Sequence, residues 1–440
     1  MNTTAKEVLQ FVQENDVKFI RLAFCDPNGV HKNISVMPGE LERVFDSGLL
    51  FDASAIPGFC DISHSDLLLC PDPSTLHVLP WRPMQGRVVR FYCNIRYPDG
   101  TTFECDARAL LLQVMGRLAK EGCQLRLGTS CKFYLFNTDE EGAPTKVPYD
   151  HGGFFDVAPL DRGENVRREI CLCLEEMGIS PETSHHDRGP GQNEIVFKYD
   201  NALAAADNFL TYKSVVKAMA ARSGLFASFA PRPLPDQNGN GLHVNMSLHK
   251  NGVNLFSPHR TDEMAPEAAS FMAGILARAA EMTAFTNPLC ASYDRLGHFE
   301  APRYVAWGRQ NRSALVRIPS CCDDLARMEL RSPDPSVNPY LVFALLLSAG
   351  LEGLQRGLAL PAPAQKNLYT ADLTDLSELA PLPATLGEAI EAAQGSSFAA
   401  GVLGREFLDR YVALKTAQWQ DYAKSSDKTG YCDQHYFRVI

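Results

Sequence analysis

The sequence predicts an α+β protein in which a small, strand-rich N-terminal domain precedes a larger domain built on an antiparallel sheet around a polar cavity. Strand pairs joined by turn signals fill the first hundred residues, and later strand candidates carry charged side chains on one face only. The chain has 440 residues, 45% of them hydrophobic and 21% charged, which is the composition of a globular protein with a sizeable core. A typical domain has about 150 residues, so this length favours one large and one small domain.

The N-terminal segment predicts a capped helix followed by a hairpin. Thr4 can cap a helix whose apolar positions recur at helical spacing. Residues 17–25 and 30–36 then read as strands around Asn28-Gly29, a strong hairpin signal. We expect these two strands to pair.

A second hairpin and a helix close this first domain. The hairpin is predicted at 88–97 and 101–104, and Asp106 can cap a helix over 107–121 that ends at Gly122. We therefore place the two domains at residues 1–105 and 106–440.

Several later segments alternate polar and apolar residues. Residues 242–248 put His243, Asn245 and Ser247 on one face and apolar side chains on the other. The same alternation brings together Ser130, Lys132 and Tyr134 in one segment, His185 and Asp187 in a second, Glu194 with Val196 and Lys198 in a third, and Glu329 and Arg331 in a fourth. For any single strand, a solvated outer face is the commoner explanation. Several such strands together favour a polar cavity, and oxygen ligands with one imidazole suit magnesium or manganese.

Arginines cluster between residues 303 and 317. Planar guanidinium groups suit phosphate oxygens, although such residues also form surface ion pairs. The chain has no Gly-rich phosphate loop of the Walker type, so a nucleotide site has to be of another kind. A Gly-rich turn at 238–241 precedes the His243 strand and is either a simple turn or a substrate-wrapping loop.

Composition excludes several classes. A net charge of −10 without basic clusters argues against nucleic-acid binding. The longest apolar stretch, 340–351, is shorter than the roughly 20 residues that cross a bilayer. An odd count of 13 scattered cysteines predicts reduced thiols, and we expect a cytoplasmic protein.

Seven ordered motifs resemble the glutamine synthetase family in its shorter bacterial type. They are LFDASAIPGF (50–59), SDLLLCPD (65–72), GGFFDVAPLD (152–161), ETSHHDRGPGQNEI (182–195), NGNGLHVNMSL (238–248), EAPRYVAWGRQNRSALVRIP (300–319) and MELRSPDPSVNPYLVFALLLSAGLEGL (328–354). The resemblance implies an N-terminal β-grasp domain and a catalytic domain whose curved sheet forms a funnel. It also implies ATP with magnesium or manganese, glutamate or a related small acid, ammonia or an amine, and a homo-oligomer, a dodecamer of two hexameric rings.

The resemblance assigns roles to individual positions. Asp52, Glu300 and Arg312 match catalytic positions. Positions that hold glutamate are matched by Asn238, Gly239, His243, Arg295 and Arg331. Nucleotide positions are matched by Glu182, Tyr199, Ser247, Arg312 and Arg317. Metal positions are matched by Asp187, Glu194, His243 and Glu329.

The metal positions depart from the family pattern. Ser130 and Lys132 replace two carboxylates, and Asp187 replaces a Glu with a side chain about one methylene shorter. One ammonium and three carboxylates leave a formal charge of −2 where the family has five carboxylates. Because an ammonium repels metal ions, we expect a badly weakened two-metal site.

Other departures affect the loop that shields the intermediate. This loop, 295–300, is one residue short and lacks its proline, Asp294 stands where the family has Lys, and Ala55 stands where it has Ser.

Two hypotheses follow. In the first, a protein with lost or strongly reduced ligase activity keeps a glutamate-like pocket, and Lys132 pairs with Asp187 or Glu194. In the second, an active ATP-dependent glutamate–ammonia or glutamate–amine ligase has altered metal use, and Lys132 is a fixed cation at the phosphates.

Overall fold

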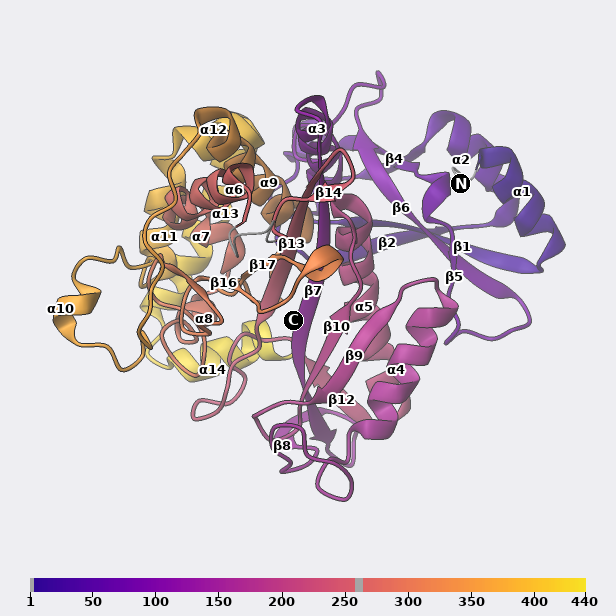
Figure 1. The fold of residues 1–440 in the computed structure, drawn as a ribbon. Helices are drawn as coiled ribbons and strands as arrows, with labels where there is room; N and C mark the ends of the chain where they lie inside the picture. The colour runs from indigo at the N-terminus through magenta and orange to yellow at the C-terminus, as the bar shows by residue number, and fades with distance from the viewer. Residues whose placement is uncertain (1–3, 258–263) are drawn as a thin grey trace.

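The structure, a computed structural model, describes residues 4–257 and 264–440 and contains two sheets (Figure 1). The first sheet has six strands in the order β2-β1-β6-β4-β3, with β5 beside β6. Its strands are β1 (Val17–Cys25), β2 (His31–Val36), β3 (Leu49–Asp52), β4 (Asp66–Pro71), β5 (His77–Val78) and β6 (Arg87–Arg96). Helices α1 (Ala5–Glu14) and α2 (Leu41–Ser47) accompany this sheet.

The predicted start of the chain is confirmed. The Thr4 hydroxyl accepts the Glu7 N–H and the Glu7 carboxylate accepts the Thr4 N–H, so a capping box begins α1. Strands β1 and β2 pair antiparallel around the Asn28-Gly29 turn. The Gly29 φ of 80° and the closeness of the Val337 carbonyl, 2.5 Å from a Cβ at this position, both require glycine there.

The second predicted hairpin forms, since the Tyr97 N–H donates to the Thr101 carbonyl and the Phe103 N–H donates to the Ile95 carbonyl, but its return arm is shorter than predicted. Residues 101–104 form only one bridge, Thr102 to Arg96. The Asp106 carboxylate accepts the Ile95 N–H at 2.8 Å, so a side chain takes a hydrogen bond that a longer strand would have made. Strand β6 instead pairs in parallel with β1 and antiparallel with β4, which places it in the middle of the sheet.

The second sheet has eleven strands in the order β15-β16-β17-β13-β7-β10-β9. All pairs on this path are antiparallel except β15 with β16. The strands on the path are β7 (Cys123–Thr138), β9 (Pro181–His186), β10 (Gln192–Phe197), β13 (Leu242–Lys250), β15 (Trp307–Arg309), β16 (Val316–Ile318) and β17 (Met328–Leu330). Strands β8 (Pro144–Pro148), β11 (Asp200–Asn201) and β12 (Leu225–Ser228) pair with β7, and β14 (Val253–Asn254) pairs with β13.

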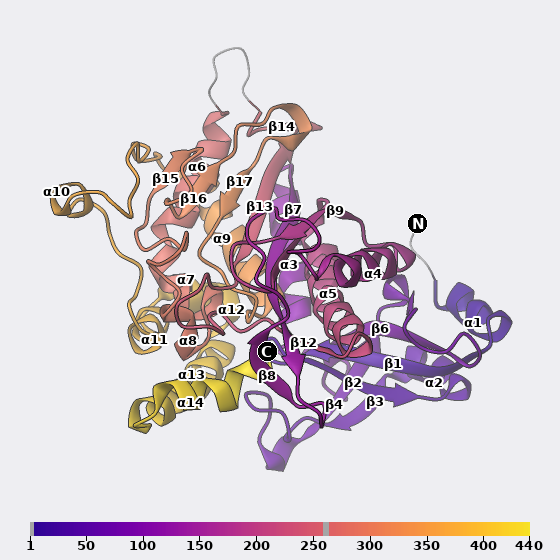
Figure 2. The ribbon, with the colours of Figure 1, turned by 90° about the horizontal axis from the view of Figure 1, so that it is seen from below.

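Helices cover this sheet and fill the other side of the molecule (Figures 1 and 2). Those that pack against its strands are α3 (Ala107–Lys120), α4 (Glu164–Glu176) and α5 (Ala202–Arg222). The remaining helices are α6 (Pro266–Ala277), α7 (Ala279–Thr286), α8 (Cys290–Tyr293), α9 (Pro339–Arg356), α10 (Leu373–Leu376), α11 (Leu386–Gln394), α12 (Ser397–Leu403), α13 (Arg405–Lys424) and α14 (Lys428–Cys432).

The apolar stretch at 340–351 lies within α9, a buried helix that packs against α3, α5 and α6. No helix in the described ranges is long and apolar enough to cross a membrane. The segment 361–383 carries the short α10, which projects from the body of the molecule in both views (Figures 1 and 2).

A buried polar network joins the two sheets through α5. The Tyr92 hydroxyl on β6 donates to the Asp207 carbonyl, and Arg90 donates to the Thr211 hydroxyl at 2.7 Å. Arg108 of α3 forms an ion pair with Asp207 at 3.0 Å. These contacts hold the first sheet against α5.

Candidate functional site

Cross-strand register gathers the predicted polar side chains on one face of the large sheet. Lys132 on β7 lies opposite Glu194 on β10, which lies opposite His185 on β9. On the other side of β7, Ser130 lies opposite His243 on β13. Lys132, Glu194 and His243 are all buried, as are Asn245, Ser247 and Glu329. The polar face is therefore buried and not a solvated surface.

Lys132 forms an ion pair on this buried face. Its ammonium lies 2.5 Å from Oδ2 of Asp187, a residue just beyond β9 that is fully buried. Burial opposes the charged form of Lys132, but the carboxylates of Glu194 and Asp187 outweigh it and raise the pKa of the lysine. Lys132 is therefore a charged, internally paired cation.

Glu194 is held ionised by the same group. Burial raises the pKa of Glu194, but the Lys132 ammonium and the His185 imidazole, 3.3 Å away, bring it below its usual range. The Glu194 carboxylate therefore neutralises the Lys132 ammonium, a cation that the protein itself supplies.

The other half of the buried face centres on Glu329 of β17. Its carboxylate pairs with Arg331 and, at 2.8 Å, with Arg317 of β16. Despite burial, His243, Arg331 and Arg317 lower the pKa of Glu329 to about 2. Burial and the Arg331 charge lower the pKa of His243 to about 3, so this imidazole is neutral; its Nδ1 lies 3.4 Å from the Ser130 hydroxyl.

These donors do not fit the two-metal centre that the resemblance implies. His185, Asp187 and Glu194 offer ligand atoms within 4.8 Å of one another, which is compact enough for an ion. However, the Lys132 ammonium already lies against Asp187 and opposite Glu194, where a divalent cation would be repelled. In the second half, two guanidinium groups bind the Glu329 carboxylate.

The residues matched to glutamate binding surround a buried guanidinium. Arg295 donates to the carbonyls of Ser332 at 2.6 Å and Arg331 at 3.1 Å, and it forms no ion pair within the described ranges. Burial lowers the pKa of Arg295 to about 10. A Cβ at Gly239 would lie 2.5 Å from the Pro231 carbonyl, and one at Gly241 would lie 2.9 Å from Nη2 of Arg295. The glycines leave room for close backbone approach.

Two further matched residues join this pocket. The Asn238 carbonyl accepts the Tyr134 hydroxyl at 2.6 Å, which fixes the Gly-rich turn on β7. Arg331 is buried and reaches from Glu329 to the carbonyls of Arg312 and Glu300. The turn at 238–241 is therefore built into the site.

Contacts with Arg188 and Arg331 hold the loop 294–300 at the site. The Glu300 carboxylate pairs with Arg188 at 3.1 Å, and its carbonyl accepts Nη2 of Arg331. Phe299 and Glu300 have positive φ values of 46° and 70°, which are uncommon for residues with a side chain. Sequence reasoning did not assign Arg188 to this contact.

The residues matched to the nucleotide are spread along β9, β13, β16 and the segment after β10. The Tyr199 ring lies against Gly128, where a Cβ would be 3.4 Å from Cδ1. The Ser247 hydroxyl lies 3.1 Å from Nε2 of His249. Glu182 is exposed on β9, and Arg312 is exposed with its carbonyl bound to Arg331.

Asp52 is not brought to this site by any contact in the described part of the chain. It is exposed at the end of β3, the edge strand of the first sheet. The Ser54 hydroxyl and N–H donate to its carboxylate and lower the pKa of Asp52.

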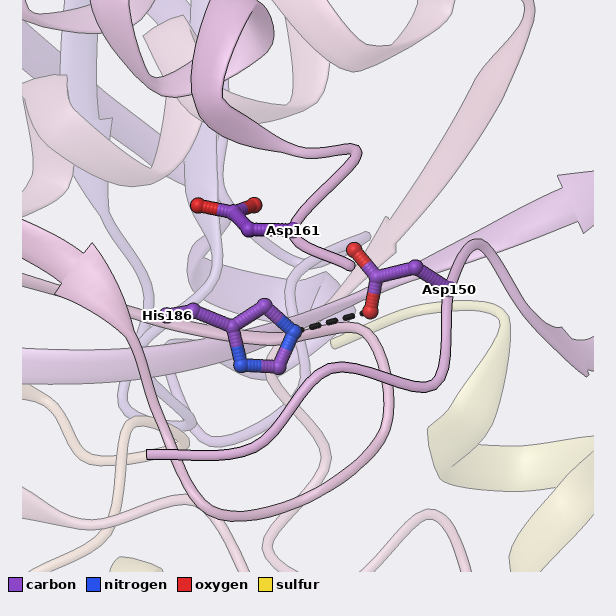
Figure 3. Close-up of side chains that lie close together, drawn as sticks. All are labelled: Asp150, Asp161 and His186. Carbon is purple, nitrogen blue, oxygen red and sulfur yellow. Dashed lines mark hydrogen bonds and ion pairs between the residues drawn. The ribbon is translucent and has the colours of Figure 1, made fainter. Parts of the chain in front are cut away.

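A second cluster of acids and histidine lies behind β9 (Figure 3). Nε2 of His186 lies 2.8 Å from Asp150, and Nδ1 lies 2.7 Å from the Asp187 carbonyl. Asp161 forms a two-pronged ion pair with Arg167, so the donor atoms of the cluster already have protein partners. The cluster fixes the backbone of Asp187. The alternation of β9, which sends His185 and His186 to opposite faces, was the signal that could have found it.

Comparison with known proteins agrees with this architecture. The model of the glutamine synthetase β-grasp domain matches residues 16–98, and that of the glutamine synthetase catalytic domain matches residues 104–432. Glutamine synthetase from Clostridium saccharobutylicum is 44% identical over 423 residues, covering 95% of this chain and 96% of the relative. Glutamine synthetase from Methanosarcina mazei is 42% identical and covers 96% of this chain and 95% of the relative.

Solved structures are also similar. A GmaS/ADP complex superposes with a TM-score of 0.87 at 29% identity, covering 97% of this chain and 98% of that one. The cryo-EM structure of Plasmodium falciparum glutamine synthetase shares the fold, with a TM-score of 0.86 at 23% identity and 99% of both chains covered. With two family models covering most of its length and relatives above 40% identity, the chain belongs to the glutamine synthetase family.

Proposed function

We propose that this protein binds glutamate or a related small acid and has lost, or retains only weakly, the ATP-dependent ligation typical of its family. One observation carries this proposal: the buried Lys132 ammonium pairs with Asp187, and Glu194 is its cross-strand neighbour. The protein's own cation thus stands where the family pattern has a metal-binding carboxylate. The division into domains 1–105 and 106–440 and assembly into two hexameric rings belong to the same proposal.

The acid-binding part of the proposal rests on Arg295. A buried guanidinium bound only to carbonyl oxygens favours a carboxylate ligand, because that ligand would supply the missing negative charge. Gly239 and Gly241 let the backbone of the turn pack directly against this guanidinium. We assign the pocket to Asn238, Gly239, His243, Arg295 and Arg331.

One observation favours a second candidate function, an active glutamate–ammonia or glutamate–amine ligase with altered metal use. His185, Asp187 and Glu194 offer three ligand atoms within 4.8 Å, so one divalent ion would find donors if the Lys132 side chain moved away. ATP would then use the positions of Glu182, Tyr199, Ser247, Arg312 and Arg317, with Asp52 and Glu300 at the ammonium and the intermediate.

Turnover measurements separate the two candidates. The wild type and a Ser130→Glu/Lys132→Glu variant are assayed for phosphate release and γ-glutamyl product with magnesium or manganese, with ammonia or methylamine as acceptor. We expect no turnover by the wild type, and metal binding by the variant, detected as metal-dependent thermal stabilisation. Lys120→Glu, which changes an exposed charge on α3, is the matched control and should behave as the wild type. Robust wild-type turnover would overturn the proposal.

Calorimetry with glutamate tests the pocket separately. The wild type should bind, and Arg295→Gln should lose binding because the amide carries no charge. Equal affinity in the two proteins would exclude Arg295 as the carboxylate partner.

A further inference from the structure

A polar cavity lies away from the candidate site, between the first sheet and α5. Its volume is about 350 Å³, within the size range of small-ligand sites. Five of the polar side chains that line it carry basic nitrogen atoms and one is a hydroxyl; no aspartate or glutamate lines it. These six are Arg21, His31, Arg90, Lys213, Ser214 and Lys217.

Two opposite walls supply the cations. Arg21 on β1 and Arg90 on β6 are register partners in a parallel pair, so their side chains leave the sheet on the same face. Lys213 and Lys217 are four residues apart on α5 and therefore lie on one face of the helix. The cavity is thus positively charged from both sides.

None of these four cations forms an ion pair with a residue in the described ranges. Instead, neutral oxygens hold them: Lys213 donates to the Pro335 carbonyl at 2.8 Å, and Lys217 donates to the Val439 carbonyl at 2.9 Å. Arg90 donates to hydroxyls and approaches His77, and its buried Nε–H has no hydrogen-bond partner. Arg90 is buried, and Arg21, Lys213 and Lys217 are half-buried. Charges withdrawn from water are ordinarily paired, but in the part of the chain that the structure describes no acidic side chain lies within ion-pair distance of these four.

His31 adds an unfilled polar position. Its Nδ1 lies 3.0 Å from the Ser214 hydroxyl, which itself donates to the Leu210 carbonyl, so Nδ1 carries the proton. The buried Nε2 has no partner among the described residues. Burial and the nearby charges of Arg90, Arg21 and Lys213 lower the pKa of His31 to about 3. Burial and the Lys213 charge likewise lower the pKa of Lys217 to about 7.

We propose that this cavity binds a small anion with two negative charges, either a dicarboxylate or a phosphate. Two cations on each wall match a ligand that presents negative oxygens to both sides. Such a ligand would supply the missing counter-charge and, by favouring the charged form of His31, would turn the unpartnered Nε2 into a donor. Because one wall belongs to the first sheet and the other to α5, the bound anion would tie these two parts together.

Thermal unfolding of the full chain tests the proposal. Succinate and inorganic phosphate are added at millimolar concentration, with sodium chloride at equal ionic strength as the reference. We expect one of the two to raise the unfolding midpoint, and which one does so identifies the ligand class. Lys217→Met should weaken its binding about tenfold or more, because a charge-assisted hydrogen bond is lost. Arg222→Gln, an exposed change on the same helix, is the matched control and should leave binding unchanged.

Two more variants separate this cavity from the Arg295 pocket and from a folding defect. Ser214→Asp places a carboxylate among the cations, so it should raise the unfolding midpoint without added anion and abolish the response to it. Arg295→Gln should leave the response intact. The proposal is wrong if neither anion stabilises the wild type, if Lys217→Met and Ser214→Asp both respond as the wild type does, or if Arg295→Gln alone loses the response.

Discussion

Two cationic regions of this molecule, one buried and one half-buried, differ in how their charge is balanced. At the candidate site, Lys132 has two carboxylates beside it and its pKa is raised. At the cavity between the first sheet and α5, Lys217 has a carbonyl as its hydrogen-bond partner and its pKa is lowered to about 7. Each lysine lies beside a strand or helix that carries other charged side chains. The comparison shows that acidic partners, and not burial alone, decide whether the pKa of a lysine is raised or lowered.

The same substitution at both lysines should therefore change stability in opposite directions, and the larger effect is expected at residue 132. Lys132→Met leaves Asp187 and Glu194 buried without their cation. Breaking a buried pair in this way costs about 3–5 kcal/mol. The free energy of unfolding, measured by urea denaturation, should fall by that amount.

Removing the charge of Asp187 as well should recover much of the stability that Lys132→Met loses. In Lys132→Met/Asp187→Asn, one uncompensated carboxylate becomes a neutral amide, so the double variant should be more stable than Lys132→Met. A double variant that is less stable would contradict the assigned pairing.

The next effect is on the pH dependence of stability. His31 and His243 have folded-state pKa values of about 3, well below the usual value of about 6.5, so each contributes stability that is present above pH 6.5 and lost as pH falls towards 3. Each histidine should add up to about 1.4 kcal/mol of loss per pH unit below 6.5. Urea denaturation between about pH 5 and 6.5 measures this slope as the difference between the wild type and each histidine variant, because Asp106, whose pKa burial raises to about 6, titrates in the same window with the opposite sign.

Variants at the two histidines sharpen the comparison. His31→Gln and His243→Gln should each reduce the slope, but a bound anion should reduce only the share of His31. His186 acts in the opposite direction, since hydrogen bonds to Asp150 and the Asp187 carbonyl raise its pKa against the effect of burial. The stability that His186 contributes is fully present below pH 6.5 and is lost as pH rises through its raised pKa. An unchanged slope in both Gln variants would contradict the neutral state of the two histidines.

The smallest expected effect is a gain. Without added anion, Lys217→Met removes one of four mutually repelling cations and should raise the free energy of unfolding by about 1 kcal/mol. Urea denaturation at pH 7 measures it, with Arg222→Gln as the exposed control. A fall in the free energy of unfolding similar to that of Lys132→Met would contradict this, because it would mean that Lys217 is paired with a negative charge.

Most of the fold could be predicted from local patterns. The Thr4 cap, the Asn28-Gly29 turn and the Asp106 cap involve residues close together in the sequence, so propensity and periodicity are enough to find them. The short length of the return arm at 101–104 could not be predicted, because the Asp106 carboxylate accepts the hydrogen bond that would have extended the strand.

The candidate site was predictable to the extent that strand alternation and family motifs coincide. They identified Ser130 and Lys132 as replacements and Asp187 or Glu194 as the partner of the lysine, and the ion pair with Asp187 is confirmed. The ion pair between Arg188 and Glu300 and the cluster of Asp150, Asp161 and His186 depend on loop conformations, which periodicity does not describe. The cavity beside α5 brings together residues about 190 positions apart, so only the packing of the first sheet on α5 could show it.

Strand β7 pairs with β8, β10, β11, β12 and β13 through backbone hydrogen bonds. Those bonds do not depend on which side chain stands at 130 or 132, so the charge of the site can change without moving the scaffold. Superposition scores are consequently blind to such a change, and two chains of this architecture can coincide in their coordinates while differing in the reactions open to them.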